Sequence, residues 1–183
     1  NKSRIKTTTY PSGFKTNHNY NSFGYPTTVT DEQATVAFWS TGDMNAYDQY
    51  LSYDLGNTLT TTKTYDDYGM PTSIISAVQH LALEFDPENG NLNYRQDYKH
   101  GGILEEFEYD PTLHKSRLTE TKIDGTVQQS MLYQTNGNIG FKTDAGNYTY
   151  DANKKNAVVQ VNNPNNIISN LVQDITYTPF NSV

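Results

Sequence analysis

Acidic side chains gather in one short segment of the chain, and paired carboxylates are a common basis of hydrolytic chemistry. Glu105, Glu106, Glu108 and Asp110 lie almost side by side in the sequence. Two facing carboxyl groups can act as acid and base in the hydrolysis of a glycosidic bond. The segment also suits a β-strand, in which Glu106 and Glu108 would share one face. A solvated strand face is the simpler interpretation, and a glycosidase-type site is its alternative.

The other potential ligands and nucleophiles lack the spacing of known sites. His18, His80, His100 and His114 are far apart, whereas a metal needs clustered ligands. Asp86 to Asp97 is similar in composition to a calcium loop, but Gly90 stands at the fifth position instead of the sixth, and position twelve is Asp97 instead of Glu. There is no cysteine, no glycine-rich phosphate loop and no triad motif. We predict no metal, no cofactor and no catalytic residue, and therefore no enzyme.

Aromatic side chains offer a different kind of site. Trp39, the only tryptophan, is followed by Tyr47, Tyr50 and Tyr53. Aromatic rings exposed on a flat sheet can stack on sugar rings or on a partner protein. Their structural alternative is packing between neighbouring hairpins. Burial of these four rings would favour the structural role, and exposure would favour ligand binding.

The composition predicts a thin β-sheet protein. Only 34% of the 183 residues are hydrophobic, yet the chain has 15 Tyr and 7 Phe and is only 18% charged. Aromatic and β-branched residues favour strands, whereas disordered chains are poor in aromatics and rich in charge. The net charge of -7 and the scattered basic residues argue against nucleic-acid binding. No apolar run approaches the roughly 18 residues of a membrane span.

A loose motif recurs along the chain: an aromatic residue, Asp or Asn, two variable residues, Gly, one variable residue, then Leu or Pro and often Thr. The copy that starts at 65 is the clearest and those at 109 and 133 are degenerate; the starts at 65, 85, 109 and 133 are 20 to 24 residues apart, as in a repeat array. The copies are Tyr20–Thr27, Tyr65–Thr72, Phe85–Leu92, Tyr109–Thr119, Tyr133–Ile139 and Tyr150–Asn153, with Tyr53–Thr60 as a further relative. The positions given a structural role are Tyr20, Gly24, Tyr65, Asp66, Gly69, Phe85, Asp86, Gly90, Tyr109, Asp110, Tyr133, Gly137, Tyr150 and Asp151.

Each motif has the chemistry of a hairpin turn. The Asp or Asn side chain can accept a hydrogen bond from a backbone N–H two residues further on, and Gly adopts positive φ without strain. The aromatic residue and the following apolar residue then lie on paired strands and can pack across the hairpin. Alternating runs such as Leu81, Leu83 and Phe85 separate the turns. We predict an all-β protein, an antiparallel meander of hairpins over one domain, residues 1–183.

The motif resembles the YD repeat of the RHS/YD-repeat family, because Tyr65-Asp66-Asp67-Tyr68-Gly69-Met70-Pro71-Thr72 follows its Tyr-Asp-x-x-Gly-x-Leu-Thr pattern. The tail, including Ile175-Thr176-Tyr177-Thr178-Pro179-Phe180-Asn181, is similar to longer RHS proteins of Bacteroidetes. The resemblance implies an extended, curved sheet that forms a segment of a spiral shell, as in bacterial toxin subunits and teneurins. The family's Asp-Pro-x-Gly self-cleavage motif has no match, so autoproteolysis is not carried over.

Three functions follow as expectations. The first is a non-catalytic shell segment of a larger secreted or cell-surface bacterial protein. Its partners would be flanking repeats and an enclosed C-terminal effector, with self-association through exposed edge strands. The second is a carbohydrate- or protein-binding module, and the third is a glycosidase.

Overall fold

The computed structural model describes residues 4–112 and 116–167, and the RHS-like tail from Ile175 and His114 lie outside the described residues. The chain forms two compact units, Asn1–Ile103 and Leu104–Val183. The prediction of one domain over residues 1–183 stays a prediction.

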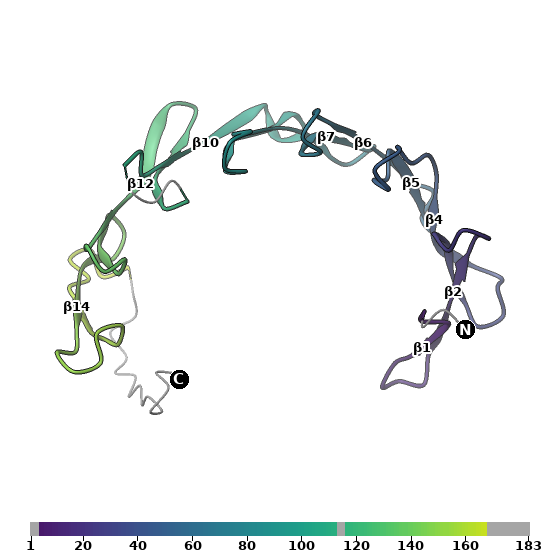
Figure 1. Ribbon diagram of the computed structural model, residues 1–183, viewed down its shortest axis with the longest axis horizontal. Helices are drawn as coiled ribbons and strands as arrows, with labels where there is room; N and C mark the ends of the chain where they lie inside the picture. The colour runs from purple at the N-terminus through teal and green to yellow at the C-terminus, as the bar shows by residue number, and fades with distance from the viewer. Residues whose placement is uncertain (1–3, 113–115, 168–183) are drawn as a thin grey trace. The chain divides into compact units, whose positions relative to one another are not determined.

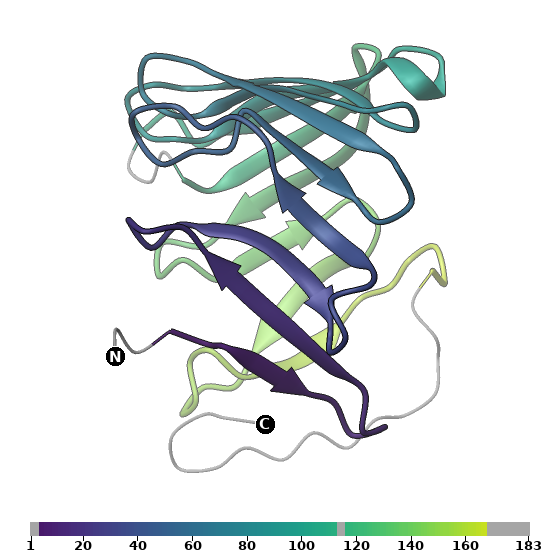
Figure 2. The ribbon, with the colours of Figure 1, turned by 90° about the vertical axis from the view of Figure 1, so that its right-hand side faces the viewer.

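The first unit is an antiparallel meander in which strand order follows chain order. Each strand pairs with the next one along the chain (Figures 1 and 2). Its strands are β1 (Thr7–Thr9), β2 (Lys15–Tyr20), β3 (Pro26–Asp31), β4 (Ala37–Thr41), β5 (Ser52–Leu55), β6 (Thr60–Tyr65), β7 (Pro71–Ile75), β8 (His80–Phe85) and β9 (Leu92–Asp97), followed by the 3₁₀ turn η1 (Tyr98–His100).

The second unit repeats this architecture with the same antiparallel pairing. Its strands are β10 (Ile103–Tyr109), which begins at the boundary, β11 (Leu118–Ile123), β12 (Thr126–Tyr133), β13 (Ile139–Lys142), β14 (Gly146–Tyr150) and β15 (Val158–Val161). The all-β antiparallel meander predicted from the hairpin motifs is confirmed. Neither unit contains a longer helix in its described residues.

Neither unit has a conventional hydrophobic core in its described part. The buried residues are few and mostly small: Thr16, Thr30, Thr61, Met131, Ala145, Gly146 and Ala157. Within each unit the strands form a single layer, which leaves most side chains half-buried at best (Figure 1). Contacts between neighbouring hairpins must therefore supply most of the stability.

Candidate functional site: the row of motif turns

The predicted pairing of the motif aromatic with the apolar residue after the turn occurs in every described copy. The register pairs are Tyr20 with Pro26, Tyr65 with Pro71, Phe85 with Leu92, Tyr109 with Leu118, Tyr133 with Ile139 and Tyr150 with Val158. The register shifts by one residue beside each of these pairs. In the clearest copy, Thr64 pairs with Ser73 and Tyr65 with Pro71, so Thr72 is the extra residue of a β-bulge. The motif threonine therefore occupies the bulge.

The Asp or Asn of the motif closes the turn with its side chain. The Asp66 carboxylate accepts hydrogen bonds from the backbone N–H groups of Tyr68 and Met70, at 2.9 and 2.8 Å. Asp151 accepts from the N–H groups of Lys154 and Asn153, and these bonds hold the pKa of its carboxyl below the usual value. Turn closure is a sufficient structural reason for the repeated acid.

One copy of the motif was not predicted from the sequence, Met44-Asn45-Ala46-Tyr47-Asp48-Gln49-Tyr50. Asn45 accepts hydrogen bonds from the N–H groups of Tyr47 and Gln49, at 2.9 and 3.1 Å. Met44 pairs with Tyr50, and Asp48 takes the glycine position with φ of 63°. The motif aromatic and glycine are both replaced, so only the spacing between the copies at 20 and 65 could have revealed it.

The proposed relative Tyr53–Thr60 lacks this geometry. Tyr53 and Asp54 lie inside β5 and pair with Thr61 and Thr60 of β6. The turn that follows joins β5 to β6, one strand further along the meander than a motif turn. This turn therefore lies at the other ends of the strands, opposite the row of motif turns. The copy of the motif in this region starts at Met44.

In each unit the motif turns form a row at the same ends of the strands, because consecutive motif turns are two antiparallel strands apart. Motif tyrosines connect each hairpin to the preceding one along this row. The Tyr133 hydroxyl donates to the Leu118 carbonyl and the Tyr150 hydroxyl to the Ile139 carbonyl, both at 2.8 Å. Equivalent bonds run from Tyr65 to the Tyr50 carbonyl, at 3.1 Å, and from Tyr20 to the Ile5 carbonyl, at 2.8 Å.

In several copies the residue directly before the second member of the register pair also reaches the next turn, and Arg4, directly before Ile5, does the same. Gln49 donates from Nε2 to the Gly69 carbonyl at 2.8 Å, and the Met70 methyl lies 3.4 Å from where a Cβ on Gly90 would be. The remaining contacts of this kind join Arg4 to Gly24, Tyr25 to Asp48, Arg117 to Gly137 and Asn138 to the Lys155 carbonyl. The position therefore varies in sequence while keeping one task, contact with the following repeat.

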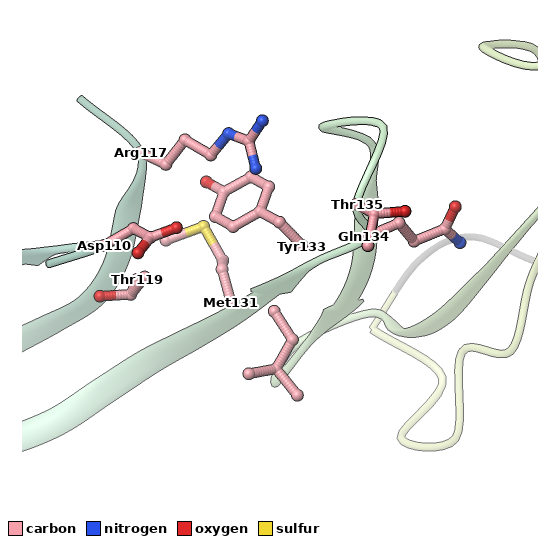
Figure 3. A pocket seen from close by; sticks show the side chains of 8 residues that line it. Asp110, Arg117, Thr119, Met131, Tyr133, Gln134 and Thr135 are labelled. Atoms are coloured by element: carbon pink, nitrogen blue, oxygen red, sulfur yellow. The ribbon is translucent and has the colours of Figure 1, made fainter. Parts of the chain in front are cut away.

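One hollow in the second unit belongs to this row. It has a volume of about 330 Å³ and lies between Asp110, Arg117, Met131 and Tyr133. Figure 3 shows the Arg117 guanidinium beside the Tyr133 ring, and the two are 5.4 Å apart. Its other lining residues are Thr119, Leu132, Gln134 and Thr135.

The same cation–π pair occurs in the first unit, where Arg4 lies 5.4 Å from the Tyr20 ring. A geometry that recurs with the motif is a stacking contact between hairpins rather than a unique active centre.

The predicted aromatic strip is divided between two environments. Trp39 and Tyr50 are half-buried and meet edge to face, with ring centroids 5.4 Å apart. Tyr53 is also half-buried and lies beneath the Lys63 ammonium, at 5.5 Å. Tyr47 is exposed at the tip of its turn. The structure thus places Trp39, Tyr50 and Tyr53 in packing contacts and separates Tyr47 from them.

The carboxylates around Glu106 and Glu108 share one face with a lysine between them. Lys122 lies directly across from Glu106 in the register and forms ion pairs with Glu108 and with Glu120, the latter at 3.2 Å. These hydrogen bonds raise the pKa of the Lys122 ammonium. Glu108 and Glu120 are therefore engaged in ion pairs across the paired strands.

Two further kinds of feature are absent from the described residues. No group of three His, Cys, Asp or Glu side chains is gathered as a metal would require within residues 4–112 and 116–167. In the same part of the chain, no helix has the length and apolar character needed to cross a membrane.

No family model matches the sequence, and no curated protein matches it significantly. Solved structures do share the fold. A chain of the Tc holotoxin pore of Photorhabdus luminescens, in a TccC3 mutant form, aligns with a TM-score of 0.62 and 16% identity over 85% of this chain. Chains of the TcdB2-TccC3-Cdc42 and TcdB2-TccC3-TEV crystal structures align with a TM-score of 0.53 and 15% identity, over 79% and 81% of this chain.

The chain spans only 8 to 9% of the length of these toxin chains. At such low identity the likeness concerns the fold alone. The chain has an RHS-related β fold.

Proposed function

We propose that this chain is a non-catalytic wall segment of an RHS/YD-repeat shell in a secreted or cell-surface bacterial protein. The observation that carries the proposal is the double contact between successive motif turns: the tyrosine hydroxyl bonds the preceding hairpin, and the variable side chain covers the next turn. Each hairpin is thereby stabilised by its neighbours rather than by a core.

The toxin-related role rests on two supports of different kinds. The first is the fold shared with Tc toxin chains. The second is the YD-like turn chemistry, seen in Asp66 with its bonds to Tyr68 and Met70. On this proposal the partners are the flanking repeats of a longer parent protein and an effector enclosed by the shell.

The absence of catalysis is part of the proposal and has a physical basis. Glu108 and Glu120 form ion pairs with Lys122. The side chain of the motif acid Asp66 accepts hydrogen bonds that close its own turn. Both arrangements give these acids a structural task, and we assign them no catalytic one.

Small-angle X-ray scattering of the 183-residue chain, with a concentration series, tests the shell proposal. A wall segment should give a radius of gyration well above the roughly 16 Å of a compact globule of this length. A radius near that value, independent of concentration, would overturn the proposal. The same series tests the predicted self-association through edge strands, which would appear as a rise in forward scattering per unit mass.

A further inference from the structure

One motif turn lacks the side chain that closes the others. In six copies, the residue after the first member of the register pair is an Asp or Asn that accepts hydrogen bonds from backbone N–H groups of its own turn. These residues are Asn21, Asn45, Asp66, Asp86, Asp110 and Asp151. Gln134 holds this position in the copy that starts at Tyr133, and its side chain makes no hydrogen bond within residues 4–112 and 116–167. Figure 3 shows it directed away from the Arg117–Tyr133 pair. A turn without this closure opens more easily.

The turn after Tyr133 contains an Asn-Gly pair, Asn136-Gly137. Such a pair can deamidate spontaneously, because glycine has no side chain to shield its backbone nitrogen from the asparagine carboxamide. In the folded turn this nitrogen is engaged, since the Gly137 N–H donates to the Gln134 carbonyl at 2.9 Å. The reaction therefore needs local opening of the turn, and the strength of turn closure sets its rate.

The Asn136 side chain is held loosely. It is exposed, and its Oδ1 accepts a single hydrogen bond, from the Asn138 N–H at 3.1 Å. Its Nδ2 has no hydrogen-bond partner among the described residues. The carboxamide is thus free to rotate toward the Gly137 nitrogen once the turn opens.

A second Asn-Gly pair, Asn89-Gly90, lies at the same place in an earlier copy of the motif and is held firmly. Asn89 is half-buried, its Nδ2 donates to Asp86 Oδ2 at 2.8 Å, and its Oδ1 accepts from the Asn91 N–H at 2.9 Å. The Gly90 N–H donates to the Asp86 carbonyl at 2.8 Å. The same dipeptide is therefore restrained here by the motif acid that the other copy lacks.

We propose that Asn136 is a site of spontaneous deamidation in the folded chain, whereas Asn89 is protected. The Gly137 nitrogen attacks Cγ of Asn136 and loses its proton, and the carboxamide nitrogen leaves as ammonia, so that a five-membered succinimide forms. Water then adds to one of the two succinimide carbonyls and opens the ring. One opening gives aspartate, and the other gives isoaspartate, in which the main chain runs through the former side chain. Water is the only co-reactant.

The modification falls at a junction between hairpins. Isoaspartate lengthens the main chain by one methylene directly before Gly137, and the Arg117 guanidinium lies 3.0 Å from where a Cβ on Gly137 would be. The same guanidinium lies 5.4 Å from the Tyr133 ring. Deamidation therefore adds a negative charge and displaces a turn that the preceding repeat contacts. The inference is independent of the shell role, because it rests on the chemistry of one turn.

Peptide mapping of the 183-residue chain after incubation at mildly alkaline pH tests the proposal. Liquid chromatography with mass spectrometry separates the unmodified, aspartyl and isoaspartyl peptides and gives a conversion rate for Asn136 and for Asn89. The same incubation in concentrated urea gives both rates without structure, which removes the effect of neighbouring sequence. Relative to its rate in urea, Asn136 should convert about tenfold faster than Asn89 in the folded chain.

Gln134→Asp restores the motif acid and should slow the conversion of Asn136 about fivefold in the folded chain, because the restored closure adds a hydrogen bond to the turn. It should have no such effect in urea. Gln134→Asn should act in the same direction without a charge, since Asn45 closes the equivalent turn in the first unit. Gln128→Asp is the charge-matched control, because Gln128 is exposed and lies toward the other end of β12.

Equal ratios of folded to urea rates for Asn136 and Asn89 would overturn the proposal. So would an unchanged rate in both Gln134 variants, or equal slowing in Gln128→Asp. A product without isoaspartate would exclude the succinimide route and overturn it as well. Scattering tests the shell role separately, so the two proposals can fail independently.

Discussion

The hydroxyl of Tyr133 donates a 2.8 Å hydrogen bond to the carbonyl of Leu118, the residue paired with Tyr109 in the preceding hairpin. Tyr150 repeats this relationship with Ile139, which is paired with Tyr133. The motif tyrosine therefore connects two hairpins. It pairs with the opposite strand of its own hairpin, and its hydroxyl donates a hydrogen bond to the preceding hairpin.

Tyr133→Phe should destabilise the second unit by about 1 kcal/mol, because the Leu118 carbonyl loses its donor while the ring is kept. Urea unfolding followed by circular dichroism measures this change. Tyr148→Phe is the control, since Tyr148 makes no comparable hydroxyl bond within the described residues.

Phe85 offers the reverse experiment, because it is a motif aromatic without a hydroxyl. By the same geometry, Phe85→Tyr should place a hydroxyl near the Pro71 carbonyl and raise the melting temperature. A fall in stability in Phe85→Tyr would contradict the proposed role of the tyrosine hydroxyl.

Asp66→Ala should cost about 1 to 2 kcal/mol, because the N–H groups of Tyr68 and Met70 lose their acceptor. Asp66→Asn should be nearly neutral, since an asparagine closes the equivalent turn at Asn45. Thermal melts of the two variants separate turn closure from charge. Equal losses in both would show that the negative charge matters more than the acceptor.

Gly24→Ala and Gly13→Ala distinguish backbone strain from contact between repeats. Both glycines have positive φ, so each alanine should cost about 1 kcal/mol in strain. A Cβ on Gly24 would also lie 1.7 Å from the Arg4 guanidinium, whereas none lies within 4 Å at Gly13. Gly24→Ala should therefore lose roughly 0.5 to 1 kcal/mol more, as Arg4 leaves the Tyr20 ring. Chemical denaturation of both variants gives the difference, and equal losses would argue against the contact.

Alkaline pH should loosen the array at its tyrosines. Burial raises the pKa of the Tyr65 and Tyr150 hydroxyls. Their stabilisation is fully present below the ordinary tyrosine value of about 10 and is lost as the pH rises through the raised values, because the unfolded chain ionises first. Absorbance at 295 nm and circular dichroism, recorded together from pH 9 upward, should show late ionisation coinciding with loss of sheet. The double variant Tyr65→Phe, Tyr150→Phe should lose sheet less steeply with pH.

The sequence was sufficient to predict the meander, because turn chemistry at Asp66 and Gly69 is local and strand pairing follows from it. It could not locate the copy at Met44, where methionine and Asp48 replace the aromatic and the glycine. The contacts made by Arg4, Gln49 and Met70 were hidden for another reason, since their side chains share no chemical type. Only the structure shows that they occupy one position. Gln49 and Met70 precede the second members of their register pairs, and Arg4 precedes Ile5, the acceptor of the Tyr20 hydroxyl.

That position has a consequence for how such a chain can be rearranged. Arg4, Tyr25, Gln49 and Met70 each meet a particular next turn, whether glycine or Asp48. Neighbouring hairpins are thus matched in pairs and are not interchangeable, even though their backbones are alike. Exchanging the order of two repeats would preserve every hairpin but mismatch the junctions on either side of those two repeats, so these side chains specify the linear order of the modules.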